Sequence, residues 1–190
     1  TFHSEAGETP CGICEATGTI RKMGRETVQV PCPKYDALAE VMDELTEVGR
    51  LVIYAGFTAS IDRITDFCKT RGWDWIRIDG RGATSSFAPT LELKELVRRF
   101  QDPNRDDIPE RIALVGHPGS AGMGLTLTAS PVTCYFSNDF SGEARIQSED
   151  RIHRPGMDEN RGATIIDLIH LPTDMFVREN LRVKRELQSL

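Results

Sequence analysis

Short apolar runs alternate with amphipathic segments along most of the chain. Leu51 to Ala55 is a continuous apolar run, the pattern of a parallel strand that is buried on both faces. Lys34 to Val48 instead has its apolar residues at helical spacing, and Gly49 follows it as a helix terminator. The chain is therefore expected to form a helix here and then a buried strand.

The same two patterns recur towards the C-terminus. Further strands are expected at Trp75–Ile78, Arg111–Val115, Val132–Phe136 and Ala163–Ile169. Further helices are expected through Arg71 and at Thr90–Phe100, Gly142–Arg154 and Asp174–Leu187, with a Gly/Ser/Thr-rich loop after Arg81. This alternation predicts an α/β fold, an open parallel sheet with right-handed crossovers and helices on both faces.

Length and composition limit the number of domains. The chain has 190 residues, of which 39% are hydrophobic, enough for one core and a small appendage. We expect the main domain at 34–190 and the appendage at 1–33. The sequence contains no long apolar span and no signal-peptide pattern, which favours a soluble cytoplasmic protein with no membrane partner. The net charge of −6 argues against a histone-like coat but permits a local basic groove.

Five cysteines, an odd number, argue against a disulfide framework, and Cys68 and Cys134 are expected to be buried free thiols. The appendage reads as a β-hairpin in which Cys11, Cys14 and Cys32 come together. Three thiolates suit a tetrahedral zinc site, and the fourth ligand would be either His3, the only nearby histidine, or a residue further upstream. Reduced cysteines in a small loop are an equally weighted alternative to bound zinc.

A charged segment, Gln147 to Gly156, follows the strand at Val132–Phe136. In a helix that begins near Gly142, one stripe would hold Gln147, Asp150, Arg151 and Arg154. Two arginines one turn apart form a permanently charged fork that suits phosphate oxygens. The alternative is a solvated helix surface in which Arg145, Glu149 and Arg151 form ion pairs.

A glycine-rich segment, Gly116 to Ala129, begins where the strand at Arg111–Val115 ends. Ligands bind at the carboxyl ends of strands in open α/β sheets. The glycines would let the backbone approach a phosphate, and Ser120, Thr126 and Thr128 offer hydroxyl groups. A tight turn from strand to helix is the alternative reading of the same glycines.

The order of these segments resembles the second RecA-like lobe of superfamily-two helicases, in particular the Swi/Snf-type DNA translocases. Leu51 to Phe57 resembles motif IV, Ile78-Asp79-Gly80-Arg81 the block after it, and Ser120-x-Gly122-x-Gly124 motif V. Gln147-x-x-Asp150-Arg151-x-His153-Arg154-x-Gly156 is similar to motif VI. The resemblance runs from Lys34 to the C-terminus. The chain departs from the family at Thr126, at Met157 and at Asp139-Phe140-Ser141.

The resemblance implies roles in ATP hydrolysis. Arg151 and Arg154 would be arginine fingers, Gln147 would lie near the nucleotide or the attacking water, and Asp150 would orient an arginine. Gly122 and Gly124 would line the ATP side. ATP and magnesium would be held mainly by a first lobe with a P-loop, and this sequence contains no Gly-x-x-x-x-Gly-Lys-[Ser/Thr] motif. We expect the chain alone to have no ATPase activity.

The resemblance also implies contacts with duplex DNA through its phosphates, without base readout. The residues expected to make them are Phe57, Thr58, Gly80, Arg81, His117, Ser120 and Thr128. The second partner would be the first RecA-like lobe of the same parent chain. The chain would then be one lobe of an ATP-dependent DNA helicase or translocase.

Other functions fit the sequence less well. A non-catalytic module that docks DNA or a partner through the lobe and a zinc knuckle has no need of two arginines aimed at a cleft. A dinucleotide-binding Rossmann domain would carry its glycine-rich loop after the first strand. DEAD-box RNA helicases usually have Gly-Arg-x-Gly-Arg where this chain has Asp150-Arg151-x-His153-Arg154. Short connections between motifs favour a bacterial or viral source, with the host-cell cytoplasm as the location of a viral protein.

Overall fold

A computed structural model describes residues 30–102, 107–120, 124–154 and 162–188. The chain divides into the units Thr1–Pro31 and Cys32–Leu190, and the fold described below is that of the second. His3, Cys11 and Cys14 lie outside the described residues, so the zinc hypothesis stays a prediction. Among the residues that are described, no group of three or more His, Cys, Asp or Glu side chains could hold a metal ion. Cys32 is a free, half-buried thiol that packs against the core.

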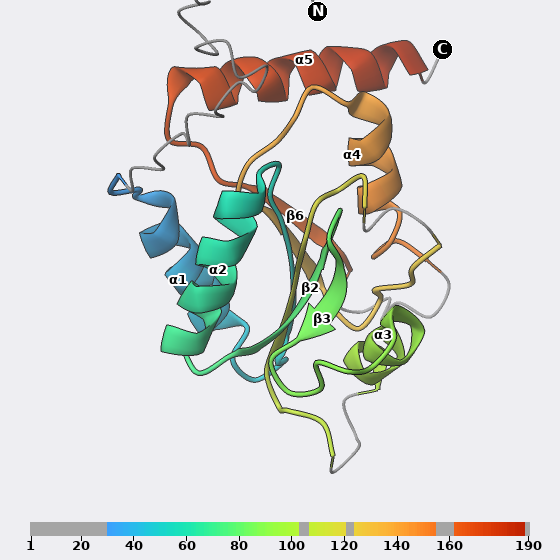
Figure 1. Cartoon of the computed structure of the whole chain (residues 1–190). Helices are drawn as coiled ribbons and strands as arrows, with labels where there is room; N and C mark the ends of the chain where they lie inside the picture. Colours follow the sequence, from blue (N-terminus) through green and yellow to red (C-terminus); the bar gives the residue numbers. More distant parts are fainter. Residues whose placement is uncertain (1–29, 103–106, 121–123, 155–161, 189–190) are drawn as a thin grey trace, which may run out of the picture. The chain divides into compact units, whose positions relative to one another are not determined.

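The second unit is built from alternating helices and strands (Figure 1). The helices are α1 (Lys34–Glu44), α2 (Thr58–Thr70), α3 (Leu93–Gln101), α4 (Gly142–Glu149) and α5 (Pro172–Gln188). The strands are β1 (Arg50–Tyr54), β2 (Asp74–Asp79), β3 (Gly82–Ser85), β4 (Ile112–Gly116), β5 (Val132–Tyr135) and β6 (Thr164–Asp167). The predicted α/β alternation is thereby confirmed.

The strands form one sheet in the order β3-β2-β4-β1-β5-β6. All neighbouring strands run parallel except β2 and β3, which pair antiparallel. Ile53 of β1 lies opposite Val115 of β4 on one side and Cys134 of β5 on the other. Because the central strands share one direction, their carboxyl ends meet at the same edge, where ligands bind in such sheets.

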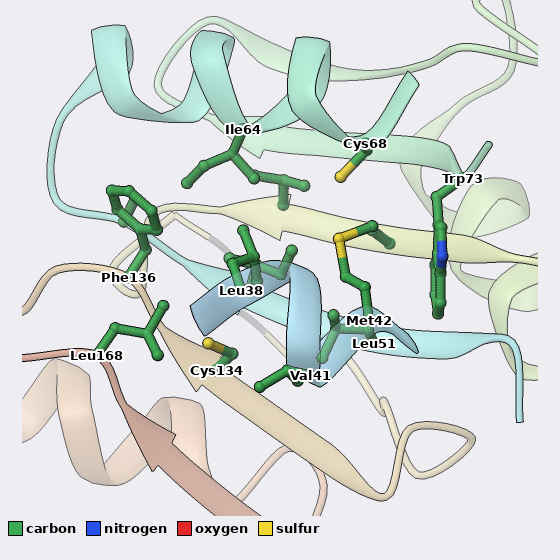
Figure 2. Close-up of a cluster of buried hydrophobic side chains, with 14 of the residues drawn as sticks. Leu38, Val41, Met42, Leu51, Ile64, Cys68, Trp73, Cys134, Phe136 and Leu168 are labelled. Atoms are coloured by element: carbon green, nitrogen blue, oxygen red, sulfur yellow. The ribbon is translucent and has the colours of Figure 1, made fainter. Parts of the chain in front are cut away.

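Side chains of each central strand alternate between two apolar layers. Leu51 and Ile53 pack with α1 and α2, whereas Val52 and Tyr54 pack with α3. This burial on both faces explains the continuous apolar run of β1. Figure 2 shows the first layer, in which side chains of α1 and α2 pack against side chains of the sheet and of the loops beside it. The labelled residues of this layer are Leu38, Val41, Met42, Leu51, Ile64, Cys68, Trp73, Cys134, Phe136 and Leu168.

The first layer contains both cysteines that were expected to be buried. Cys68 and Cys134 are fully buried free thiols, which confirms that expectation. Burial raises the pKa of each thiol to about 12. Because the thiolate is the reactive species, burial lowers the reactivity of these two side chains, which pack as small apolar groups.

The second layer includes loop segments as well as α3. Leu127, from the glycine-rich segment, and Ile152, from the charged segment, are both fully buried beside the fully buried Phe100. Each of the two candidate segments therefore contributes a side chain to the core. This packing holds the backbone in place at Leu127 and at Ile152.

The prediction of a loop directly after Arg81 is wrong, because the residues there form the short strand β3. Asp79 and Gly82 pair across a two-residue turn, and Gly82 has a φ of 103° that favours glycine. β3, with the sequence Gly-Ala-Thr-Ser, lacks the large β-branched and aromatic side chains that mark strands in sequence. It forms because β2 offers it a free edge.

The predicted helix Gly142–Arg154 is too long, since α4 ends at Glu149. The Asp150 amide still donates to the carbonyl of Ile146, but the amides of Arg151 and Ile152 donate to the carbonyls of Ser148 and Glu149, three residues back, at 3.3 Å each. Such bonds tighten the chain into 3₁₀-type turns. The carbonyl of Arg151 accepts instead from the amide of Leu127 at 3.0 Å. The expected single helical stripe therefore does not form.

Candidate functional site

Most of the residues proposed to contact DNA do lie together at the carboxyl edge of the sheet. Phe57 and Thr58 follow β1, Gly80 and Arg81 follow β2, and His117 follows β4. β1 and β2 both pair with β4, so these positions are neighbours. Phe57 is 69% exposed, which leaves its ring available at this edge.

Thr128 lies elsewhere, and its expected place at a strand carboxyl end is wrong. Its hydroxyl accepts a hydrogen bond from Gln101 Nε2 at 2.9 Å, and the neighbouring Ala129 amide donates to Gln101 Oε1 at 2.8 Å. Ser130 Oγ donates to the carbonyl of Arg50, the first residue of β1, at 3.2 Å. This segment therefore runs to the amino end of the sheet, so Thr128 has a structural role there.

Arg81 is held by two carboxylates. Its guanidinium donates to Asp79 Oδ2 at 2.6 Å and to Asp62 Oδ1 at 2.7 Å. The hydrogen bond from Arg81 is the largest cause that holds the pKa of both carboxyl groups below their usual range. The Arg81 side chain is 41% exposed, so an incoming phosphate would compete with Asp62 for the same donors.

His117 has a defined tautomer. Its Nδ1 accepts a hydrogen bond from the amide of Gly119 at 3.1 Å, so Nε2 carries the proton in the neutral ring. Nε2 lies 3.8 Å from Asp139 Oδ2, in the loop after β5. Ser120, whose amide donates to the carbonyl of His117 at 3.0 Å, continues the same turn. The ring therefore presents one N–H group at the carboxyl edge of the sheet.

The glycine-rich and charged segments are joined directly. Besides the bond from the Leu127 amide to the Arg151 carbonyl, Arg151 Nη1 lies 3.5 Å from the carbonyl oxygen of Leu125. Gly124, with a φ of 73°, precedes this contact. A backbone change in one segment must therefore move the other. Gly122 and Gly156 lie outside the described residues.

The two arginines of the charged segment differ in exposure. Arg151 is only 7% exposed, whereas Arg154 is half-buried. Burial lowers the pKa of Arg151, and repulsion from the Arg154 charge lowers it further. Two positive charges are thus held near each other, an arrangement that an anion would stabilise.

Gln147 and Asp150 are exposed on either side of the end of α4. Gln147 Nε2 donates to Glu143 Oε1 at 2.9 Å, one turn back on the same helix. The Asp150 charge acts on Arg151, whose pKa it raises against the effect of burial. The expected role of Asp150 in orienting an arginine is compatible with this proximity.

An open groove of about 780 Å³ borders the glycine-rich segment. α3 forms one wall with Leu93, Val97 and Gln101, and Gly124 to Thr126 form the other. The volume lies within the range of small-molecule sites. Sequence reasoning missed this groove because the two walls are far apart in the chain.

Sequence reasoning also missed Arg145, which was considered only as part of a solvated surface. Its side chain is 12% exposed and pairs with Asp167 at the end of β6, 2.6 Å away. The signal in the sequence was weak, because an arginine in an amphipathic helix usually faces solvent. The partner that buries it lies on another strand.

Comparisons with known proteins agree with this arrangement, although no protein-family model matches the chain. The chain is 25% identical over 156 residues to the human SWI/SNF-related matrix-associated actin-dependent regulator of chromatin subfamily A member 1. It is 26% identical over 158 residues to the ISWI chromatin-remodeling complex ATPase ISW1 of Saccharomyces cerevisiae. The matches cover 82% and 83% of this chain, but the chain spans only 14% and 13% of those proteins.

The fold has a counterpart among solved structures. The crystal structure of the C-terminal part of the Fun30 ATPase domain superposes with a TM-score of 0.60 and 19% sequence identity. The match covers 80% of this chain and 48% of that one. The fold is therefore that of a RecA-like lobe.

The chain is therefore similar in sequence to part of a SWI/SNF-related regulator of chromatin and to part of a chromatin-remodeling ATPase, and its fold is similar to that of the C-terminal part of an ATPase domain. The relatives named above are eukaryotic and give no support to a bacterial or viral source. Within the described part of the chain, no helix has the length and apolar content that a membrane crossing requires.

Proposed function

We propose that this chain is the second RecA-like lobe of an ATP-dependent DNA translocase or helicase. In this role it supplies positive charge to ATP bound on a first lobe of the parent chain and contacts DNA phosphates at its sheet edge. The observation that carries the proposal is the hydrogen bond from the Leu127 amide to the Arg151 carbonyl, which joins the glycine-rich segment to the charged segment. Arg151 is fixed against a backbone turn, with Arg154 three residues later, and such an arrangement is preorganised for a phosphate.

The two arginines have different parts in this proposal. Arg154 is half-buried and is the one that reaches the γ-phosphate. Arg151, which is buried against Leu125 and Leu127, holds the turn and adds to the local positive potential. An arginine finger of this kind stabilises charge on the transferred phosphoryl group and contributes roughly 10³ to 10⁵ in rate.

ATP and magnesium would be held mainly by the first lobe, because this sequence has no P-loop. On this lobe, Arg151, Arg154 and the backbone at Gly124 are the groups that fit a triphosphate. Gln147 is exposed at the end of α4 and would act on the nucleotide or the attacking water. Closure of the two lobes on ATP and their reopening after hydrolysis would move the DNA-contact edge along the strand.

The DNA contacts proposed for this edge are Phe57, Thr58, Gly80, Arg81, His117 and Ser120. Backbone amides, hydroxyl groups and an imidazole N–H are donors that bind phosphate without reading the base sequence. The proposal is for duplex DNA held by its backbone. The shared edge of β1, β2 and β4 supports it, since one strand of DNA could touch all three ends.

A docking module without catalysis is the second candidate, and one observation favours it. Phe140 and Phe176 are 52% and 65% exposed, with ring centroids 6.3 Å apart, and Met175 nearby in sequence is 62% exposed. Exposed apolar side chains in contact with one another are typical of surfaces that bind a partner. Such a surface needs no ATP.

One assay separates the two candidates. DNA-stimulated ATP hydrolysis is measured on a parent polypeptide that contains this lobe and a P-loop lobe, with and without Arg154→Ala. We expect Arg154→Ala to lower kcat by roughly 10³ or more, and the matched control Arg182→Ala, on the exposed part of α5, to leave it unchanged. The chain by itself should show no turnover. A parent that hydrolyses no ATP with DNA present would favour the docking module.

A further inference from the structure

One largely buried arginine holds the end of α4. Arg145 Nε donates to Glu149 Oε1 at 2.5 Å. Its Nη1 donates to Asn138 Oδ1 at 2.7 Å and to Asp167 Oδ1 at 2.6 Å, and its Nη2 donates to Asp167 Oδ2 at 3.1 Å. The guanidinium thus ties α4 to the loop after β5 and to the carboxyl end of β6.

A tyrosine completes the cage around this guanidinium. The Arg145 guanidinium carbon lies 3.5 Å from the centroid of the Tyr135 ring. Tyr135 Oη and Ser148 Oγ are 2.5 Å apart, and Ser148 Oγ donates to the carbonyl of Arg145 at 2.8 Å. Arg145 is therefore fixed from the side by carboxylates and across its face by an aromatic ring.

The residues held by Arg145 are those from which the proposed ATP-side turn begins. The carbonyls of Ser148 and Glu149 accept the amides of Arg151 and Ile152, at 3.3 Å each. Glu149 is also bound by Arg185 of α5, 3.0 Å away. The network therefore acts on the end of α4 from three sides, at the point where the helix gives way to the turn.

We propose that Arg145 is a positioning residue, which fixes the end of α4 so that Arg151 and Arg154 are presented to the nucleotide. The proposal rests on the proposed function for the role of those two arginines. It deepens that function by assigning their geometry to a residue outside the charged segment.

The chemistry of the network favours positioning over simple stabilisation. A buried ion pair adds little net stability, because desolvation offsets the attraction, and its better-attested use is to specify one arrangement. The bidentate bond to Asp167 and the stacked Tyr135 ring both require a planar fork. Lysine at this position would keep the charge and lose both features.

Hydrogen exchange on the chain tests the positioning directly. The readout is the exchange rate of the Leu127 amide, which reports on its bond to the Arg151 carbonyl, relative to the Val52 and Leu114 amides of the central strands. In Arg145→Lys we expect the Leu127 amide to exchange about tenfold faster, as for the loss of one charge-assisted hydrogen bond, while the strand amides keep their protection.

A second variant and a control keep the result interpretable. Ser148→Ala removes the hydroxyl group that joins Tyr135 to α4. It should also speed exchange of the Leu127 amide, but by a smaller factor than Arg145→Lys. The control Arg182→Lys changes an arginine that pairs with Glu179 and Glu186 at the surface, and should change neither class of amide. Unaltered Leu127 protection in Arg145→Lys would overturn the proposal. If the Leu127, Val52 and Leu114 amides all exchanged faster by the same factor, Arg145 would stabilise the whole fold and would have no specific positioning role.

Kinetics on the two-lobe parent test the consequence for ATP. We expect Arg145→Lys to lower kcat by about 10- to 100-fold, the range for a small misplacement of a catalytic group, with less than about a twofold change in the KM for ATP. A change confined to KM would contradict positioning. If the unmodified parent does not hydrolyse ATP, the proposed function fails, but the exchange rates still decide whether Arg145 fixes the turn.

Discussion

Two arginine clusters stand at the carboxyl edge of the sheet, and they differ mainly in their exposure to water. Arg81 lies between Asp79 and Asp62 with 41% of its side chain exposed. Arg145 lies between Asp167 and Glu149 with 12% exposed. Each cluster pairs one guanidinium with two carboxylates, but Arg145 also donates to Asn138 and stacks on the Tyr135 ring.

That difference assigns the two clusters different tasks. Asp79 is buried, but Asp62 is 48% exposed, so water screens the pair that Asp62 forms with Arg81 and a phosphate can replace this carboxylate at little cost. Around Arg145, any lost partner leaves a buried charge behind. The exposed Arg81 cluster is therefore suited to exchange a carboxylate partner for a phosphate. The buried Arg145 cluster is suited to hold the backbone at the end of α4 in one position. This division matches the DNA-contact role proposed for Arg81 and the positioning role proposed for Arg145.

The largest expected effect is the loss of the buried guanidinium. Arg145→Met leaves the carboxylates of Asp167 and Glu149 without their main partner, and should lower the free energy of unfolding by about 3–5 kcal/mol. Urea denaturation at neutral pH measures it. The matched change at the exposed cluster, Asp62→Asn, removes a carboxylate whose side chain is 48% exposed and should shift the midpoint only slightly. Equal midpoints for the two variants would contradict the comparison.

The sequence predicted the fold well because its main signal is local. Leu51 to Ala55 is apolar throughout since both faces of β1 are covered, and such a run can be recognised without its neighbours. β3 was missed because Gly82 to Ser85 has no strand propensity of its own. It is a strand only because the edge of β2 lies beside it.

The candidate site was less predictable, because its geometry comes from contacts between distant segments. The sequence identified Arg151 and Arg154 as a pair, but their helical stripe was wrong. The amide of Leu127 donates a hydrogen bond to the carbonyl of Arg151, which lies 24 positions later in the chain. The burial of Arg145 likewise depends on Asp167, 22 positions away. Helical periodicity carries no information about such partners.

A smaller effect on stability is expected when acid protonates Asp79, because its bond to Arg81 is then lost. The hydrogen bond from Arg81 holds the pKa of Asp79 below that of an unfolded aspartate, about 3.9. A depressed pKa stabilises the fold at higher pH, so this contribution is complete above roughly pH 5 and is lost as pH falls through the folded pKa. We expect Asp79→Asn to be less stable than the unmodified chain at neutral pH and to approach it at pH 3.

Unfolding by urea at a series of pH values gives these curves. Arg81→Gln leaves the buried Asp79 carboxylate without this partner, so its loss of stability should be largest at neutral pH and should shrink as Asp79 takes up a proton in acid. Curves for Asp79→Asn and the unmodified chain that stay parallel down to pH 3 would show that Arg81 does not stabilise the ionised carboxylate.

The smallest expected effect concerns DNA. Asp62→Asn removes a competitor for the Arg81 guanidinium, so under the proposed function it should strengthen binding to duplex DNA by a few-fold, the scale of one exposed ion pair. Fluorescence anisotropy at several salt concentrations measures it, and Arg81→Gln should lower the slope of log affinity against log salt by about one. Asp66→Asn, one helical turn further along α2, removes the same charge but leaves Arg81 untouched. A matching gain in Asp66→Asn would mean that net charge alone sets the affinity. A gain confined to Asp62→Asn would identify Arg81 as the group that changes partners when DNA arrives.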